Sequence, residues 1–275
     1  MNSPITTPIA VSMKMMGIVF LIGAASIPVA ALAEPSPQGL HAAMTKFAAS
    51  KPSKQLELAP APASACYEDV TEGAIADCTA EIKRTAAKDL DRPYNARGWV
   101  YYNTGDFDHA LADYNEAIRR NARTPDAWGN RAMIELYRDD LAKALADISQ
   151  AAEISPEDPT TALWLDIIGD RNGIRSSLAR RSEKFDMTKW PGPIVKLYMG
   201  DLTPAAVLAA ADQSDVNVRT LHTCQANFYI GMLKLRAGAK TDAARYLHEA
   251  ASKCRPADIE HHASVLELQR IERKR

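Results

Sequence analysis

From residue 66 onward, the chain carries apolar and small residues at helical spacing. In His109–Ile118 (HALADYNEAI) they recur three or four positions apart, which places them on one face of an α-helix. Alanine is abundant and runs of β-branched residues are few, and both features favour helices over strands. We therefore predict an all-α domain over residues 66–275.

An internal repeat relates these helical segments. His109–Ile118 matches Lys143–Ala152 (KALADISQAA) at an offset of 34 residues, and Gly73–Ile82 (GAIADCTAEI) matches it at an offset of 36. A fourth copy lies near the end of the chain. There the spacings 7, 5 and 7 recur between the small residues of the two copies, which are Gly98, Gly105, Ala110 and Ala117 in the first and Gly231, Gly238, Ala243 and Ala250 in the second.

This period and these small residues resemble the tetratricopeptide repeat, whose unit is two antiparallel helices. Gly98 and Ala110 are expected where the two helices cross, and Tyr114 is expected to fill the gap beside them. Gly105 permits the tight turn between the helices. One hairpin cannot bury its own apolar face, so neighbouring hairpins stack into a solenoid whose first helices line the concave side.

The middle and the end of the predicted solenoid depart from the repeat. Asp158–Gln213 keeps the periodicity of helical hairpins, with a turn at Gly200 and a helix start at Thr203, but it does not match the repeat positions. Ala257–Arg275 has the pattern of a capping helix. The predicted fold is therefore a tetratricopeptide-repeat solenoid with irregular central hairpins and a C-terminal capping helix.

The amino terminus has the features of a secretory signal peptide. Residues 1–33 contain the single charge of Lys14, and an apolar run ends in Ala-Leu-Ala. We predict cleavage between Ala33 and Glu34, which sends the protein to the periplasm. The alternative is an uncleaved membrane anchor. Met13 is an alternative start of the chain.

Residues 34–65 are rich in proline, alanine and serine and are predicted to be a flexible segment before the solenoid. The whole chain has 33 basic and 34 acidic residues, so its charge gives no case for nucleic acid as a partner. Its 13 glycines form no nucleotide-binding cluster.

No enzyme motif is found, and we predict neither catalysis nor a cofactor nor a metal. The neighbouring Asp139 and Asp140 are expected at a solvated turn. Asp113 and Asp147 recur at the repeat period, which indicates a structural role. The remaining alternative is an enzyme whose pocket is formed by Asp158–Gln213.

Four cysteines in a secreted chain suggest two disulfides, for which three pairings are possible. Cys224 and Cys254 lie 15 residues on either side of Ala239, in the turn of the last clear hairpin. Antiparallel helices place them opposite each other, so we predict this bridge. Cys66 and Cys78 then remain as the second pair. The alternative in each case is a buried free thiol.

Cys254 is close in sequence to His248, His261 and His262, which raises the alternative of a metal site. Adjacent residues such as His261 and His262 cannot point in the same direction on a helix. We therefore predict that these histidines lie on a solvated face.

The concave side of the solenoid is the predicted binding surface. Side-chain amides there can bond an extended peptide backbone, and aromatic residues can anchor a partner. The alternative is that Trp99 and Tyr102 pack against neighbouring helices. This face lacks the Lys and Arg residues that grip peptide carboxyl ends. By repeat position, the predicted groove contains Asn95, Trp99, Tyr102, Asn103, Asn130, Met133 and Tyr137.

The later part of the chain resembles the NlpI group of bacterial envelope tetratricopeptide-repeat proteins. The resemblance rests on Trp164, Trp190, Tyr198–Asp201 and Asn227–Gly231. It implies a non-enzymatic adaptor that holds cell-wall hydrolases and a periplasmic protease, often as a homodimer. This chain lacks the lipid-bearing cysteine of that group. We predict a periplasmic scaffold that binds proteins. The alternative is a structural component of an envelope complex that has no peptide-binding groove.

Overall fold

The computed structural model describes residues 72–273 of the chain. The predicted signal peptide, the predicted flexible segment and residues 66–71 lie outside the described residues. The described part is all-α and contains no strand. None of its helices is both long and apolar enough to cross a membrane.

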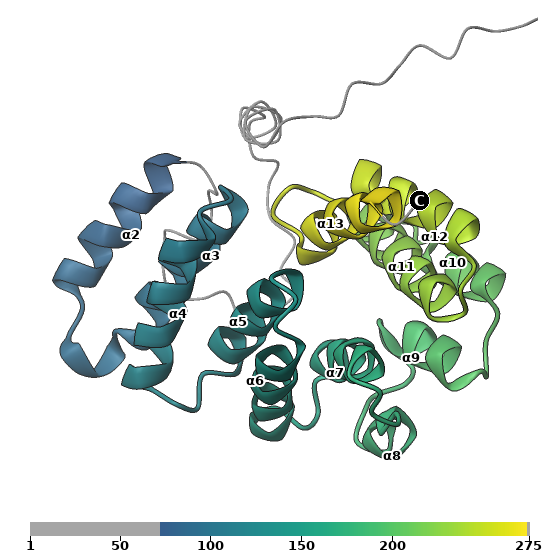
Figure 1. Ribbon diagram of the computed structural model, residues 1–275, viewed down its shortest axis with the longest axis horizontal. Helices are drawn as coiled ribbons and strands as arrows, with labels where there is room; N and C mark the ends of the chain where they lie inside the picture. Colours follow the sequence, from purple (N-terminus) through teal and green to yellow (C-terminus); the bar gives the residue numbers. More distant parts are fainter. Residues whose placement is uncertain (1–71, 274–275) are drawn as a thin grey trace, which may run out of the picture. The chain divides into compact units, whose positions relative to one another are not determined.

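The all-α prediction is confirmed by a succession of helices in which neighbours lie side by side (Figure 1). A short 3-10 helix, Ala87–Asp89, joins the first two. The α-helices of the described residues are α2 (Glu72–Arg84), α3 (Asp91–Asn103), α4 (Phe107–Arg120), α5 (Pro125–Tyr137), α6 (Leu141–Ile154), α7 (Pro159–Arg171), α8 (Leu178–Ser182), α9 (Gly192–Met199), α10 (Pro204–Ala211), α11 (Val216–Arg236), α12 (Lys240–Lys253) and α13 (Ile259–Arg273).

The predicted hairpins are the pairs α3–α4, α5–α6 and α11–α12. In two of them the helices cross at a glycine. A Cβ atom on Gly98 would lie 2.7 Å from Cε1 of Tyr114, and one on Gly231 would lie 2.8 Å from Cγ of Leu247. Both distances are shorter than a carbon–carbon contact allows. The glycines therefore set the spacing between the two helices of each hairpin.

Two partly buried ion pairs recur at the repeat period and confirm the structural role of Asp113 and Asp147. The guanidinium of Arg97 donates two 2.8 Å hydrogen bonds to Asp113, and Arg131 donates two 2.7 Å bonds to Asp147. Each arginine also reaches the preceding unit, where Thr79 accepts from Arg97 and Asn115 accepts from Arg131. We call this pair of links the arginine ladder. It ties neighbouring hairpins together through charge-assisted bonds.

The repeat continues one helix further than the sequence analysis predicted. Helix α7 begins at Pro159, 34 residues after Pro125 at the start of α5. The turns that follow α3, α5 and α7 place a left-handed residue at the same spacing, with φ values of 82° at Gly105, 62° at Asp139 and 70° at Gly173. After α7 the second helix is replaced by the five-residue α8. The irregular hairpins therefore begin at α8 rather than at Asp158.

In the irregular part, the predicted turn and helix start are confirmed. Gly200 ends α9 in the left-handed conformation, with φ 88°. Thr203 then caps α10, because its hydroxyl accepts a hydrogen bond from the backbone N–H of Ala206.

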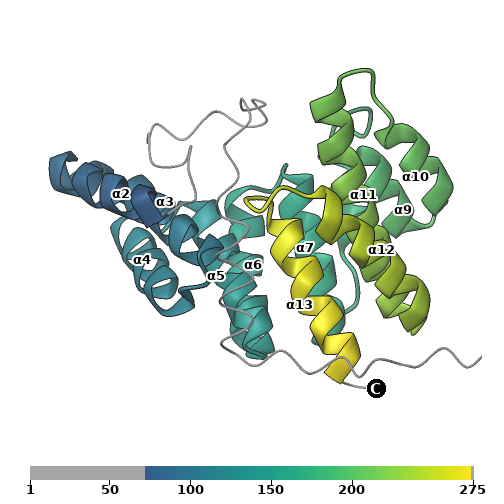
Figure 2. The same ribbon diagram turned by 90° about the horizontal axis from the view of Figure 1, so that it is seen from above.

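The predicted C-terminal helix is α13, and it packs on α12. It also contacts the inner side of the repeat helices (Figure 2). The guanidinium of Arg171 in α7 forms a 2.6 Å ion pair with the buried Glu267 of α13. Helix α13 therefore packs on the last hairpin and also bonds to helices of the earlier repeat units.

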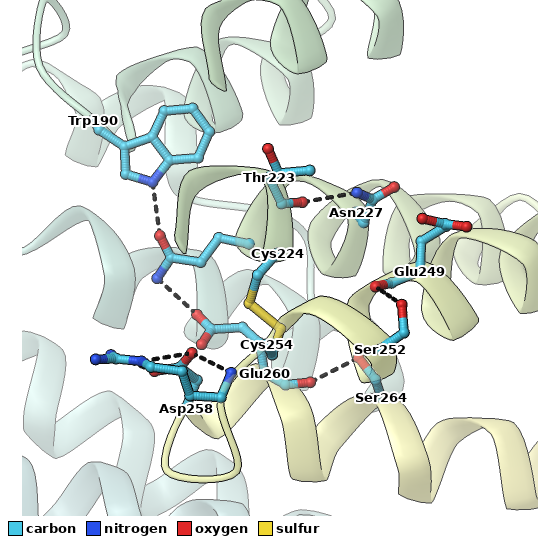
Figure 3. The surroundings of a disulfide bond; sticks show 12 residues. Trp190, Thr223, Cys224, Asn227, Glu249, Ser252, Cys254, Asp258, Glu260 and Ser264 are labelled. Atoms are coloured by element: carbon cyan, nitrogen blue, oxygen red, sulfur yellow. Dashed lines mark hydrogen bonds and ion pairs between the residues drawn. A yellow bond between two sulfur atoms is a disulfide. The ribbon is translucent and has the colours of Figure 1, made fainter. Parts of the chain in front are cut away.

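The expected Cys224–Cys254 disulfide is present, with the two Cα atoms 4.9 Å apart. It joins α11 to the carboxyl end of α12, directly before the loop that leads into α13 (Figure 3). Cys78 lies in a small core with Ala74, Ala96 and Val100, and it is also held in a disulfide. Cys66 lies outside the described residues, so its pairing with Cys78 stays a prediction.

Substitution of the crossing glycines tests the spacing of the hairpins. Gly98→Ala and Gly231→Ala are each expected to lower the free energy of unfolding by about 1–3 kcal/mol, because the new methyl group overpacks the crossing. Gly129→Ala is the matched control, because this helical glycine has nothing within 4 Å of a built Cβ atom. Alanine there is expected to stabilise by about 0.5–1 kcal/mol. Urea unfolding measures all three, and equal signs would contradict the crossing argument.

Removal of the disulfide tests its contribution to stability. The bridge closes a loop of 30 residues. The chain-entropy model therefore predicts a loss of about 3.5 kcal/mol in the double variant Cys224→Ala/Cys254→Ala. Urea unfolding measures the loss, and mass spectrometry of unreduced peptides identifies the bridge in the wild-type protein. An unchanged midpoint would show that the bridge does not constrain the unfolded chain.

Candidate binding cavity on the inner face

A cavity of about 360 Å³ lies on the inner side of the repeat helices. Its walls come from α3, α5, α6 and α7 on one side, and from α11 and the start of α13 on the other. We call it the inner cavity. Its size is at the lower end of the range for ligand sites.

Three of the predicted groove residues line the inner cavity, namely Trp99, Asn130 and Met133. Trp99 is half-buried and its ring stacks on Tyr102, with centroids 5.5 Å apart. Asn95 lies behind this wall, where its buried carboxamide oxygen accepts a 3.3 Å hydrogen bond from Asn130. Of the predicted asparagines, Asn130 is therefore the one that lines the cavity.

The other three predicted residues do not face an open groove, because α13 covers them. Tyr102 is 1% exposed, and its ring meets His262 edge-on with centroids 5.3 Å apart. The amide nitrogen of Asn103 donates to the carbonyl of Trp99, while its oxygen is paired at 3.1 Å with Nε2 of His262. This corrects two expectations: the amide of Asn103 was predicted to bond a peptide, and the ring of Tyr102 was predicted to anchor one, whereas Tyr102 packs against neighbouring helices as the alternative had it.

Tyr137 is covered by the far end of the same helix. The guanidinium of Arg270 lies over the Tyr137 ring, 5.3 Å from its centroid, and donates a 2.9 Å hydrogen bond to the carbonyl of Leu136. Arg270 also pairs with Asp139, the exposed residue of the turn. The carboxyl-terminal half of α13 thus occupies the place that the sequence assigned to a partner.

His262 is the clearest correction among the histidines. It was predicted on a solvated face, yet it is buried against Tyr102 and Asn103. Burial and the neighbouring His261 lower the pKa of His262 to about 4, so the ring is neutral at pH 7. No group of three or more potential metal ligands occurs in the described part of the chain.

A partly buried chain of hydrogen bonds reaches Gln225 and Glu260 in the cavity wall. The indole N–H of Trp190 donates a 2.7 Å hydrogen bond to the carboxamide oxygen of Gln225, whose nitrogen donates a 3.1 Å bond to Glu260. Glu260 lies beside the Cys224–Cys254 disulfide (Figure 3). Burial raises the pKa of Glu260 to about 7, with a smaller contribution from Asp258.

Two more carboxylates lie at the amino-terminal ends of α5 and α7. Asp126 is exposed at the cavity wall, while the surrounding protein and the nearby Asp158 raise its pKa. Asp158 caps α7 and accepts hydrogen bonds from the backbone N–H groups of Thr160 and Thr161. The two aspartates come from different repeat units and meet at one end of the cavity.

The sequence analysis did not predict several of the polar and aromatic residues that line the cavity, namely Asp126, Asp158, Trp164, Gln225 and Glu260. The repeat offset from Pro125 to Pro159 was a usable signal for α7. It would have brought Asp158 and Trp164 to the inner side. Gln225 and Glu260 approach through the packing of α11 and α13, for which no local pattern exists.

Residues 95–159 match a family model of the tetratricopeptide repeat. The match begins inside α3 and ends at the first residue of α7. Together with the helical architecture, it supports a tetratricopeptide-repeat protein. Domains of this kind typically bind protein partners and are generally non-enzymatic. The cavity-lining Trp99, Asn130 and Met133 all lie within the matched residues.

The raised pKa of Glu260 predicts a specific pH dependence. A carboxyl whose pKa is about 7 in the folded state and 4.5 in the reference state stabilises the fold fully below pH 4.5. That stability is lost as the pH rises through 7. Glu260→Gln keeps the acceptor for Gln225 and removes the ionisation. Its stability relative to wild type is therefore expected to grow by about 2 kcal/mol from pH 5 to pH 8.

Urea unfolding at several pH values measures this difference. Glu272→Gln, at an exposed position near the end of α13, controls for the loss of one negative charge. A difference between Glu260→Gln and wild type that is constant with pH would contradict the raised pKa of Glu260.

Proposed function

We propose that this tetratricopeptide-repeat chain is a non-enzymatic adaptor that binds envelope proteins through the inner cavity. The observation that carries the proposal is the cavity itself. One wall is formed by α3, α5 and α7, the first helices of successive repeat units, and it carries the aromatic, amide and thioether side chains of Trp99, Asn130 and Met133. A half-buried aromatic ring beside a hydrogen-bonding amide suits an extended protein segment.

We place this activity in the periplasm. The proposal is supported by the signal-peptide pattern that ends at Ala33 and by the Cys224–Cys254 disulfide. Disulfides persist in oxidising compartments such as the bacterial periplasm. The resemblance to the NlpI group suggests cell-wall hydrolases or an envelope protease as partners, and a homodimer as the assembly.

A second candidate function is that of a structural or assembly component without a peptide groove. It is favoured by α13, which already covers Tyr102, Asn103 and Tyr137 on the inner side. In that case the solenoid serves as a spacer, and its inner side is largely satisfied by its own C-terminal helix.

Crosslinking in intact cells, followed by mass spectrometry of the captured proteins, separates the two functions. The wild-type chain is compared with the variant Trp99→Ala/Asn130→Ala. An adaptor is expected to lose at least about tenfold in partner recovery, because the variant removes an aromatic anchor and the cavity amide. Captured cell-wall hydrolases or an envelope protease would support the proposed partners.

Trp128→Ala is the matched control. This tryptophan is also on α5 but contacts Ala122 and Arg131 instead of lining the cavity. Circular dichroism checks that each variant folds. Equal partner recovery by the cavity variant and the wild type would overturn the adaptor function in favour of the structural one. Recovery of no protein above background would contradict both.

A further inference from the structure

The inner cavity carries an excess of negative charge. Four carboxylates line it, from Asp126, Asp158, Asp258 and Glu260, against the single guanidinium of Arg255. That guanidinium is already engaged, because it donates bonds of 2.6 Å and 3.0 Å to Asp258. Three carboxylates from three different elements are therefore left without a balancing cation in the wall.

The surroundings of two of these side chains, Asp126 and Glu260, disfavour their ionised forms. Desolvation by the surrounding protein and, to a smaller extent, the nearby Asp158 raise the pKa of Asp126, against the opposing effect of Arg92. Burial raises that of Glu260, against the hydrogen bond from Gln225 and the charge of Arg255. A bound cation would relieve both penalties.

A buried hydrogen-bond donor also lies in the wall without a partner. Trp164 lines the cavity and is 3% exposed. Its ring packs against Phe228 and Tyr229, while its indole N–H has no hydrogen-bond partner in the described part of the chain. An unsatisfied buried donor is costly, so this position favours a ligand that brings an acceptor.

Two further features of the wall suit such a ligand. Gly129 lies in the middle of α5 on the cavity wall, and nothing lies within 4 Å of a built Cβ atom. Trp99 and Trp164 add aromatic faces, which attract cations. The cavity thus combines carboxylates, tryptophan rings and a free donor.

We propose that the inner cavity binds a protein segment through an arginine or lysine side chain, whose cationic head is held by Asp126, Asp158 and Glu260. A backbone carbonyl of the same segment accepts the indole N–H of Trp164. Arginine is preferred, because its planar guanidinium both stacks on tryptophan and bonds carboxylates in pairs. The proposal rests on the adaptor function and specifies the chemistry of its partner.

Pentapeptide mixtures with a fixed central residue test this proposal on the folded chain. The central residue is arginine, lysine, citrulline or glutamate, the flanking positions are randomised, and fluorescence anisotropy measures binding. Citrulline keeps the shape of arginine and removes its charge. We expect arginine peptides to bind at least about tenfold more tightly than citrulline peptides, a difference of about 1.4 kcal/mol.

The variant Asp126→Asn/Glu260→Gln is expected to abolish the preference for arginine. Gly129→Leu, which fills the open wall with a good helix former, is expected to weaken binding of every peptide. Asp201→Asn, in an exposed turn outside the cavity, is the matched control for charge. Unfolding curves establish that each variant is folded.

Equal affinity for arginine and citrulline peptides, or a preference that survives Asp126→Asn/Glu260→Gln, overturns the proposal. Binding of free spermidine in the absence of peptide binding also overturns it, because the site would then be one for small cations. If cellular partner recovery still depends on Trp99 and Asn130, only the cationic specificity fails. Loss of that dependence as well would remove the adaptor function.

Discussion

The close approach of paired helices at a glycine is the constraint on which the rest of the structure depends. At Gly98 and at Gly231 the facing side chain, Tyr114 or Leu247, occupies the space of a Cβ atom. Because the hairpins are this thin, each exposes an apolar face on both sides and must stack on its neighbours. The inner cavity exists because the stack brings the first helices of several units to one side.

The C-terminal helix gives the stack a second role. A terminal helix that only shielded the last hairpin would leave the inner side to solvent. Helix α13 instead contacts α3, α5 and α7 through His262, Arg270 and Glu267. It fills part of the inner side and leaves the cavity near the amino ends of α5 and α7. The surface available to a partner is thus defined by the chain itself.

Much of the fold could be predicted from sequence, because the repeat imposes local rules. The repeat positions of Gly98, Gly105 and Asp113 are determined by contacts within one or two repeat units, and their spacing can be recognised in the sequence. The site could be predicted only in part. Trp99 and Asn130 follow from repeat position, whereas Glu260 reaches the cavity through the packing of α13.

His262 illustrates why the remainder was out of reach. Two adjacent histidines on a helix suggest a solvated face, and only the tertiary contact with Tyr102 and Asn103 reverses that expectation. A helix with several polar residues can be buried when each finds a partner across the interface. Such long-range pairing leaves no periodic trace in the sequence.

The arginine ladder gives the stack a direction. Each arginine holds the aspartate of its own unit and reaches back to a hydroxyl or amide of the unit before it, as Arg97 does with Thr79 and Arg131 with Asn115. The repeat units are therefore not interchangeable. An inserted or transplanted hairpin would fit only if its second helix offered an acceptor to the arginine of the next unit. The contacts between neighbouring hairpins therefore restrict their order.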